Sequence, residues 1–412
     1  MTTTHLHFEN FFVITGALAL FFLAVVFLCW CHNRPHPLSD IEADEDRNSN
    51  QRPPCTVLDR EKLWEPGCAN DLSGQSGGLS LIVQRTIARQ LTLLEAIGSG
   101  TYGEVWHARW RDRDVAVKVF LSHCESSWKR ETEIYQTVSL RHESILGFIA
   151  SDITSGTDQQ TNMYIITDYH PFGSLYDFLK FHTLSADIMT NLALSASKGL
   201  SHLHTEIQGT IATGKPAMAH RDISSNNILV KANLTCCLAD FGLAVRHSSE
   251  TEEVDVTPNR MVGTRIYMAP EVLGDTMNFS NIGAFKMADI YSFGLVLWEM
   301  NRRCCSDDTG LCEEFQRPYL DLLPSDPSFE DVKKVVLTER KRPSIPTRWE
   351  EHEPLRTMTK VMTECWAHNP AARLTALRVQ KAINKLKKSI DSQIDDMNND
   401  NTTGRHSMIL SV

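Results

Sequence analysis

A glycine-rich loop is the first candidate for a functional site. Gly98, Gly100 and Gly103 form a GxGxxGxV motif that ends at Val105. Glycine has no Cβ, so such a loop can lay its backbone close over phosphate groups. The motif is weak by itself, because an ordinary glycine turn also explains it. A dinucleotide site would place a helix directly after the loop, whereas residues 103–109 are typical of a strand, which argues against that kind of site.

A lysine in an apolar strand is the next candidate. Lys118 ends the string VAVK within the apolar residues 115–120. An unpaired buried ammonium is costly, so this side chain must reach a strand edge or find an anion. Glu131 follows thirteen residues later on a candidate helix. A Lys–Glu pair that also grips the α- and β-phosphates of a nucleotide would give each charge a partner.

Two carboxylates and an amide complete the series. Asp222 and Asn227 belong to the string HRDISSNN, and Asp240 begins the string DFG eighteen residues after Asp222. Asp222 could accept a hydrogen bond from a substrate hydroxyl, while Asn227 and Asp240 could hold Mg²⁺ (or Mn²⁺) at the phosphates of ATP. Residues 269–271 (APE) close the segment. All five motifs in this order predict an ATP-dependent protein kinase.

The residues around the APE string indicate the substrate hydroxyl and two structural contacts. Thr264 before YMAPE resembles the serine/threonine-kinase pattern, because tyrosine kinases typically carry a proline-containing platform there. We expect Glu271 to pair with Arg373 and Asp289 to brace the catalytic loop. Exposed surface charges are the plainer alternative for both.

The predicted secondary structure changes from mainly strands to mainly helices along the chain. Strands are predicted at 91–97, 103–109, 114–119 and 162–168, and helices at 81–90, 126–137, 185–204, 288–300, 355–366 and 374–388. Strands first and helices later predict an α+β fold. We expect a two-lobed protein kinase domain over 91–388, with a small β-rich N-lobe and a larger helical C-lobe, followed by a disordered tail at 389–412.

An apolar run near the start predicts one transmembrane helix at 11–31. No Asp, Glu, Lys or Arg occurs from residue 10 to 33, and 21 helical residues span about 31 Å, the thickness of the hydrocarbon core. A cleaved signal peptide fits less well, because no basic segment precedes the run and no small-residue cleavage site follows. Arg34 and the need for ATP place the kinase in the cytosol, with residues 1–10 as a short extracellular stub and 32–70 as a juxtamembrane linker. The chain is therefore expected at the cell membrane with single-pass type I topology.

Composition excludes two other classes. The formal net charge is −10, so no electrostatic footprint for nucleic acid is present. The 11 Cys are scattered without a zinc-binding spacing, which excludes a disulfide-rich secreted fold and predicts a reducing compartment for most of the chain.

Longer strings carry a family resemblance. They are LIVQRTIAR (81–89), GEVW (103–106), EIYQ (133–136), LRHE (140–143), ILGFIA (145–150), GKPA (214–217) and RLTALR (373–378). From about residue 73 to 388 the chain resembles the type I receptor serine/threonine kinases of the transforming-growth-factor-β/bone-morphogenetic-protein superfamily, and is most similar to the activin-receptor-like members. The resemblance implies a two-lobed kinase that phosphorylates Smad proteins on serine.

The resemblance also implies sites and partners. The implied ATP-binding residues are Ile97, Gly98, Gly100, Gly103, Val105, Ala116, Lys118, Thr167, Asp168 and His170. The implied catalytic residues are Asp222, Lys118, Glu131 and Asn227, and the implied metal ligands are Asn227 and Asp240. A glycine-serine regulatory segment at 71–90 would be phosphorylated on Ser73, Ser76 or Ser80 by a type II receptor kinase and would bind an FKBP-type inhibitor. The loop 151–161 (SDITSGTDQQT) is similar to the loop that selects Smads, and its start resembles the bone-morphogenetic-protein branch.

Several features depart from the family pattern. No cysteine-rich ligand-binding ectodomain precedes the predicted membrane helix, and the glycine-serine segment keeps only Ser73 in register. Ser224 stands where serine/threonine kinases usually have Lys. Ser224 could hydrogen-bond Asp222 or a water, but it supplies no charge. We therefore predict a slow enzyme, and keep a scaffold or decoy that pairs with receptors and Smads as the alternative.

Overall fold

The structure, a computed structural model, describes residues 87–100, 103–155, 161–209, 214–248, 251–256, 262–306 and 310–409. The predicted stub (1–10), membrane helix (11–31) and linker (32–70) lie outside these residues, as do Ser73, Ser76 and Ser80. Among the helices within these ranges, none is both long and apolar enough to cross a membrane.

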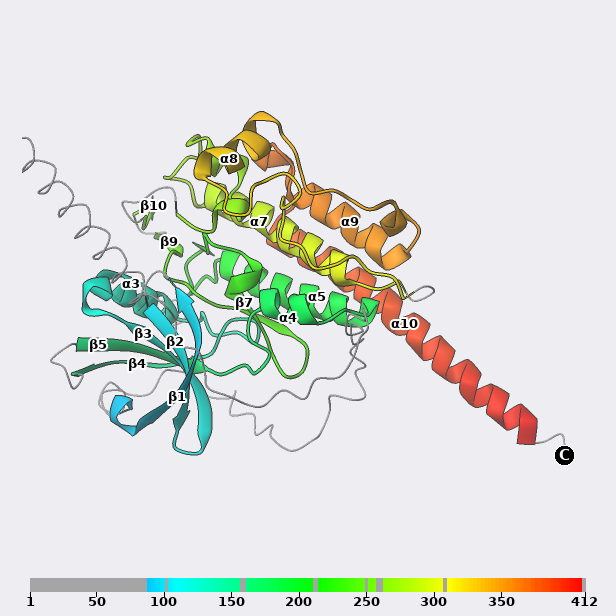
Figure 1. Cartoon of the computed structure of the whole chain (residues 1–412), viewed down its shortest axis with the longest axis horizontal. Coiled ribbons are helices and arrows are strands. Elements are labelled where there is room, and N and C mark those ends of the chain that lie inside the picture. Colours follow the sequence, from blue (N-terminus) through cyan, green and yellow to red (C-terminus); the bar gives the residue numbers. More distant parts are fainter. Residues whose placement is uncertain are drawn as a thin grey trace, which may run out of the picture. The chain divides into compact units, whose positions relative to one another are not determined.

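The N-lobe is built on a five-stranded antiparallel sheet in the order β1-β2-β3-β5-β4 (Figure 1). Its strands are β1 (Leu91–Gly100), β2 (Gly103–Trp110), β3 (Arg113–Phe120), β4 (Phe148–Ser155) and β5 (Thr161–Asp168). Successive side chains of β3 point to opposite faces of the sheet, as in any strand. Val115 and Val117 pack in an apolar cluster with Ile166, whereas Ala116 and Lys118 line a cleft.

Helix α3 (Glu125–Tyr135) is the helix that packs on this sheet. Trp128 donates its Nε1–H to the main-chain oxygen of Tyr164 on β5, at 3.0 Å. Ile134 and Tyr135 are buried in the main core, and Glu131 is buried although it is charged. The helix is therefore held by its apolar face, with Glu131 turned to the interior.

The C-lobe is mainly helical. Its long helices are α5 (Ala186–His204), α7 (Ile282–Arg303), α9 (Glu353–Cys365) and α10 (Ala376–Ile409), with the shorter α4 (Leu175–Phe181), α6 (Pro270–Leu273) and α8 (Phe329–Lys333). Side-chain caps explain where several of them begin. Ser174, Ser185 and Asn281 each accept a hydrogen bond from a main-chain N–H in the first turn that follows. Helix α5 packs against α10, and α7 packs against α9.

Short strands place the loops of the cleft. They are β6 (Met218–Ala219), β7 (Ile228–Val230), β8 (Cys236–Leu238), β9 (Val245–Ser248) and β10 (Glu253–Val254). Strands β7 and β8 form a hairpin, while β6, β9 and β10 form a small sheet in the order β10-β9-β6. The residues between β6 and β7 make the catalytic loop, and the residues from Asp240 to Glu271 make the activation segment.

The predicted strands and helices are confirmed to within a few residues, except α7, which begins six residues earlier than expected, and the ends of the chain. Of the helix expected at 81–90, the structure describes a single 3-10 turn, Ala88–Gln90. The disordered tail expected at 389–412 is wrong for residues 389–409, because α10 continues to Ile409. Ile383, Leu386 and Ile390 are buried at helical spacing along one face. Lys387 Nζ lies 2.8 Å from Asp187 Oδ1 on α5, so the part of α10 around Lys387 is tied to the lobe, whereas residues 391–396 beyond it are exposed.

Candidate active site

A cleft of about 1070 Å³ is lined by residues of both lobes. All ten residues predicted to bind ATP line it. The predicted catalytic and metal-binding residues, Glu131, Asp222, Asn227 and Asp240, line it as well. The structure therefore brings into one site residues that are up to 143 positions apart in the sequence, from Ile97 to Asp240.

The glycine-rich loop is the turn between β1 and β2. Gly98 is paired with Val105, and Gly100 with Gly103, across the hairpin. Gly103 has φ +153°, and a Cβ at this position would lie 1.8 Å from the main-chain oxygen of Val119. Glycine is required here because β2 runs tightly against β3, and the same hairpin forms the N-lobe edge of the cleft.

Lys118 is held between two carboxylates. Its Nζ lies 2.8 Å from Glu131 Oε2 on α3 and 2.9 Å from Asp240 Oδ1 at the start of the activation segment. Burial would lower the pKa of Lys118, but the two carboxylates outweigh burial and raise it above its usual value. Burial raises the pKa of Glu131, with Lys118 opposing the change. Burial would raise the pKa of Asp240, but Lys118, together with His220 and the main chain of Gly242, outweighs burial and lowers it.

Asp222 is fixed by hydrogen bonds to both carboxylate oxygens. Its Oδ2 accepts from Asn227 Nδ2 at 2.9 Å, and its Oδ1 accepts from the main-chain N–H of Thr264 at 2.7 Å. Gly263 lies against this loop with φ +109°, and a Cβ there would lie 2.8 Å from the main-chain oxygen of Arg221. The carboxylate of Asp222 is thus oriented toward the cleft by its neighbours rather than by its own chain alone.

The catalytic loop is braced from below by Asp289 on α7, as predicted. Asp289 Oδ2 accepts from the main-chain N–H of His220 at 2.7 Å, and Oδ1 accepts from that of Arg221 at 2.8 Å. His204 Nε2 lies 3.0 Å from Asp289 Oδ2. Asp289 is 2% exposed, so the plainer alternative of a surface charge is excluded.

The predicted pair of Glu271 and Arg373 is also confirmed. Arg373 Nη1 and Nη2 lie 2.6 and 2.7 Å from the two carboxylate oxygens of Glu271, a two-pronged geometry. The Arg373 side chain is fully buried. Arg373 also donates to main-chain oxygens of Ala367 and Met287, so it fixes the end of the activation segment to the base of the C-lobe.

Thr167 and Asp168 end β5, and His170 lies two residues beyond it; all three line the cleft. The carboxylate of Asp168 is occupied, because Arg113 Nη2 lies 2.5 Å from its Oδ1. A Cβ on Gly147 would lie 2.0 Å from Asp168 Oδ2, so Gly147 makes room for this side chain. Burial lowers the pKa of His170 to about 4. His170 is therefore neutral at pH 7 and can present uncharged groups to a base.

Ser224 does not make the hydrogen bond to Asp222 that the sequence suggested. Its side chain is fully buried, and its Oγ has no hydrogen-bond partner among the described residues. It does not hydrogen-bond Asp222, whose oxygens are held by Asn227 and Thr264. Ser224 is also absent from the residues that line the cleft. The Ser224 side chain is uncharged, so this position of the catalytic loop supplies no positive charge to the cleft.

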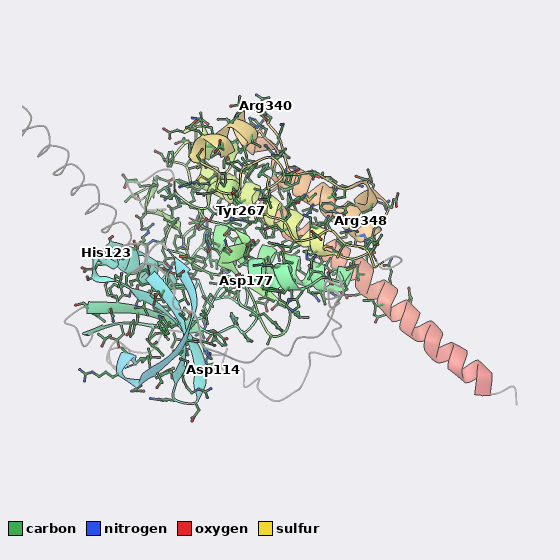
Figure 2. The ribbon with its side chains drawn as sticks, viewed as in Figure 1. Asp114, His123, Asp177, Tyr267, Arg340 and Arg348 are labelled. Atoms are coloured by element: carbon green, nitrogen blue, oxygen red, sulfur yellow. The ribbon has the colours of Figure 1, made fainter. Side chains whose placement is uncertain are left out.

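Four further residues that line the cleft were not predicted. Ser174 and Asp177 of the α4 start, Arg265 of the activation segment and Phe329 of α8 all line it. Figure 2 shows Asp177 in the C-lobe. It also shows Tyr267 there, two residues after Arg265. Arg265 directly follows Thr264, whose main-chain N–H donates to Asp222, so its place in the cleft could have been inferred from the hydroxyl-type motif.

Comparisons with known proteins agree with this geometry. The family model described as protein tyrosine and serine/threonine kinase matches residues 91–383. The chain is 50% identical over 381 residues to the TGF-beta receptor type-1 of Rattus norvegicus and of Homo sapiens, covering 91% of this chain and 73% of each receptor. It is 49% identical over 385 residues to the activin receptor type-1B of Homo sapiens, covering 93% and 74%. The chain is a serine/threonine protein kinase and belongs to the type I receptor family that contains these proteins.

Proposed function

We propose that the chain is a membrane-anchored receptor kinase that transfers the γ-phosphate of ATP to serines of Smad-type substrates. The observation that carries the proposal is the joint placement of Asp222 and of the Lys118–Glu131–Asp240 charges in one cleft. A phosphoryl-transfer site needs a group that orients the attacking hydroxyl and cations that hold the phosphates. Asp222 can supply the orienting group and Lys118 one of the cations, which supports the proposal.

In this proposal each residue has one task. Asp222, held by Asn227 and Thr264, accepts a hydrogen bond from the substrate serine and aligns its oxygen with the phosphorus. Lys118 holds the α- and β-phosphates, and Glu131 keeps the Lys118 side chain in place. The glycine-rich loop covers the phosphates with its backbone, and the chain from Thr167 to His170 receives the base.

The residues fit a magnesium ion that is shared with the substrate phosphates. Asn227 donates its Nδ2–H to Asp222, so its Oδ1 is the atom that can face a cation beside the Asp240 carboxylate. No cluster of three or more His, Cys, Asp or Glu able to hold a metal occurs within the described ranges. Mg²⁺ is commonly bound by one or two carboxylates together with phosphate oxygens. When bound, Mg²⁺ (or Mn²⁺) would neutralise charge that develops on those oxygens.

The substrate and partners follow from the family. We propose Smad proteins as substrates, a type II receptor as the activating kinase, and an FKBP-type protein as an inhibitor at the glycine-serine segment with Ser73, Ser76 and Ser80. Of the proposed Smad-selecting segment 151–161, residues 151–155 belong to the edge strand β4 and Thr161 begins β5. The branch of ligands that the receptor serves remains a prediction from the start of this loop.

Membrane anchoring rests on the apolar residues 11–31. They are long enough for one span, and Arg34 on the C-terminal side favours a cytosolic kinase. Protease added to intact cells that express the chain should leave the kinase uncut and should cut it after permeabilisation. Digestion of the kinase in intact cells would overturn this topology.

A scaffold is the second candidate, and the observation that favours it is Ser224. No Lys stands at this position, so one positive charge that many kinases place near the transferred phosphate is missing. A scaffold would bind receptors and Smads without transferring phosphate. The charges at Lys118, Glu131, Asp222 and Asp240 argue for the enzyme, because a scaffold has no need of them.

One experiment separates the two. The full chain, purified in detergent, is incubated with ATP labelled in the γ-phosphate and with a recombinant Smad. Transfer to serines near the Smad C-terminus, lost in Asp240→Asn, is the expected result. Smad binding without transfer would establish the scaffold. Transfer to casein but not to the Smad would show that the chain is a kinase and that Smads are not its substrates.

A further inference from the structure

Two arginines from different elements converge on Asp255, a carboxylate of the activation segment. Arg130 of α3 donates Nη1–H to Asp255 Oδ2 and donates Nη2–H to the main-chain oxygen of Asp255 at 2.9 Å. Arg246 of β9 donates Nη2–H to the same Oδ2 at 3.0 Å. The three residues are called the α3 clamp below. They join parts of the chain that are 125 residues apart.

Arg130 is the inner arm of the clamp. Its side chain is 12% exposed, and it also donates Nη2–H to the main-chain oxygen of Ala244 at 2.7 Å. Its Nε is buried without a hydrogen-bond partner among the described residues. A buried guanidinium that is not fully satisfied depends strongly on the carboxylate it does contact. Asp255 is therefore the main counter-charge of Arg130.

The clamp bears on catalysis because Arg130 directly precedes Glu131. Neighbouring residues of an α-helix project about 100° apart around its axis. When Arg130 is held by the activation segment, the rotation of α3 is fixed, and Glu131 is turned toward Lys118. The contact of Lys118 and Glu131 at 2.8 Å is thus maintained by a residue on the adjacent face of the helix.

The activation segment supplies a firm anchor for the clamp. The main-chain N–H of Asp255 donates to the main-chain oxygen of Arg246 at 2.9 Å. Strand β9, which carries Arg246, pairs with β6 directly before the catalytic loop. Arg246 Nη2 also lies 3.7 Å from Glu133, a second residue of α3. The clamp therefore connects α3 to the strand layer that carries the catalytic loop.

We propose that Asp255 is a positioning residue that holds α3 in the orientation needed for catalysis, as a built-in counterpart of a phosphorylated activation-segment residue. In kinases that are switched by phosphorylation, the added phosphate orders the segment by pairing with arginines. Here the carboxylate of Asp255 already pairs with two arginines, Arg130 and Arg246. Burial alone would raise the pKa of Asp255, but hydrogen bonds from Arg130 and Arg246 lower it, so the carboxylate is charged at neutral pH. The proposal rests on the kinase reaction, not on Smad substrates or membrane anchoring.

Asp255→Asn tests the proposal, because it keeps the shape and removes the charge. Glu253→Gln is the matched control, since Glu253 is an exposed acid of the neighbouring strand β10. The full chain, purified in detergent, is assayed for transfer from ATP to casein. We expect kcat to fall at least fivefold in Asp255→Asn, to be restored at least by half in Asp255→Glu, and to be unchanged in Glu253→Gln.

Hydrogen exchange supplies a readout that needs no activity. Amides of Glu125–Tyr135 should exchange faster in Asp255→Asn than in wild type or Glu253→Gln, with thermal unfolding still cooperative. Unchanged exchange in α3, or equal kcat in Asp255→Asn and wild type, would overturn the proposal. If Asp255→Asn does not fold, Arg246→Gln carries the same test with the same expected losses. Failure of both to fold would assign the clamp to stability alone and would also overturn it.

Discussion

The ammonium of Lys118 lies 2.9 Å from Oδ1 of Asp240, a carboxylate 122 residues further along the chain. Glu131 contacts the same ammonium from the other side at 2.8 Å. The two carboxylates differ in exposure, with 3% for Glu131 and 41% for Asp240. Glu131 can therefore act only as an anchor, whereas Asp240 faces the cleft, where it can also meet a cation.

Replacement of Lys118 by Met should abolish most phosphate transfer. The change removes the cation that holds the phosphates, and the loss of one such charge typically costs about 10²–10³ in rate. Glu131 would take up a proton, because burial already raises its pKa, so the fold should survive. The measurement is γ-phosphate transfer at saturating ATP, with far-ultraviolet circular dichroism as the check on folding. Transfer at the wild-type rate would place the site elsewhere.

Replacement of Ser224 by Lys should raise turnover at least fivefold. The Ser224 side chain is buried outside the residues that line the cleft, so the longer Lys side chain must carry its ammonium into the cleft for the charge to act. There, a positive charge about 4 Å from a developing negative charge contributes roughly 1 to 4 kcal/mol, depending on the effective dielectric constant. Ser224→Ala is the control and should match wild type, because the Ser224 hydroxyl makes no hydrogen bond within the described part of the chain. Turnover is measured with saturating ATP. Equal or lower turnover in Ser224→Lys would show that the charge is not needed.

Replacement of Arg373 by Ala should lower the free energy of unfolding by about 3–5 kcal/mol. Removal of one partner from a buried ion pair leaves the other charge uncompensated, and here that charge is Glu271. Lys341→Ala is a suitable control, because Lys341 pairs with Glu339 on the surface. Urea denaturation checks both variants. An Arg373→Ala midpoint equal to that of Lys341→Ala would mean that the buried pair contributes little.

Glu299 on α7 should make stability depend on pH. The side chain is fully buried and accepts hydrogen bonds from Tyr267 Oη at 2.9 Å and Ser225 Oγ at 3.2 Å. Burial raises its pKa to about 8, above the ordinary value of 4.5. Between these two pH values the folded state binds more protons than the unfolded state, so stability falls as pH rises, by up to about 1.4 kcal/mol per unit.

Glu299→Gln isolates this effect from the histidines that also titrate in the range. The difference in unfolding free energy between wild type and Glu299→Gln should shift against the wild type from pH 5 to pH 8. Urea denaturation at four pH values measures it. A difference that stays constant across this range would mean that Glu299 does not change protonation on unfolding.

Most of the fold was predictable because local signals and long-range packing agree. The alternation along β3 separates Val115 and Val117 from Ala116 and Lys118, and the structure places the two sets on opposite faces. The helical tail was not predicted, because residues 389–409 are polar and gave no strong apolar period. The contact of Lys387 with Asp187, 200 residues earlier, could not be read from the local sequence.

The candidate site was predictable as a set of residues but not as a geometry. Motif spacing named Lys118, Asp222 and Asp240, and the structure brings them to one cleft. The α3 clamp could not be predicted from the sequence, because Arg130 and Asp255 belong to no motif and an ion pair between distant residues leaves no periodic signal. The lack of a hydrogen-bond partner for the Ser224 hydroxyl among the described residues could not be predicted either, because the burial of a loop residue depends on the packing around it.

The most direct test of the account is phosphoamino acid analysis of substrate labelled by the full chain and by Asp222→Asn. The Asp222 carboxylate is proposed to orient a serine hydroxyl, and its position is fixed by Asn227 and Thr264 at 2.9 and 2.7 Å. We expect labelled phosphoserine with the wild type and a loss of at least about 10²-fold in Asp222→Asn. Undiminished labelling in the variant, or label found on tyrosine, would contradict it.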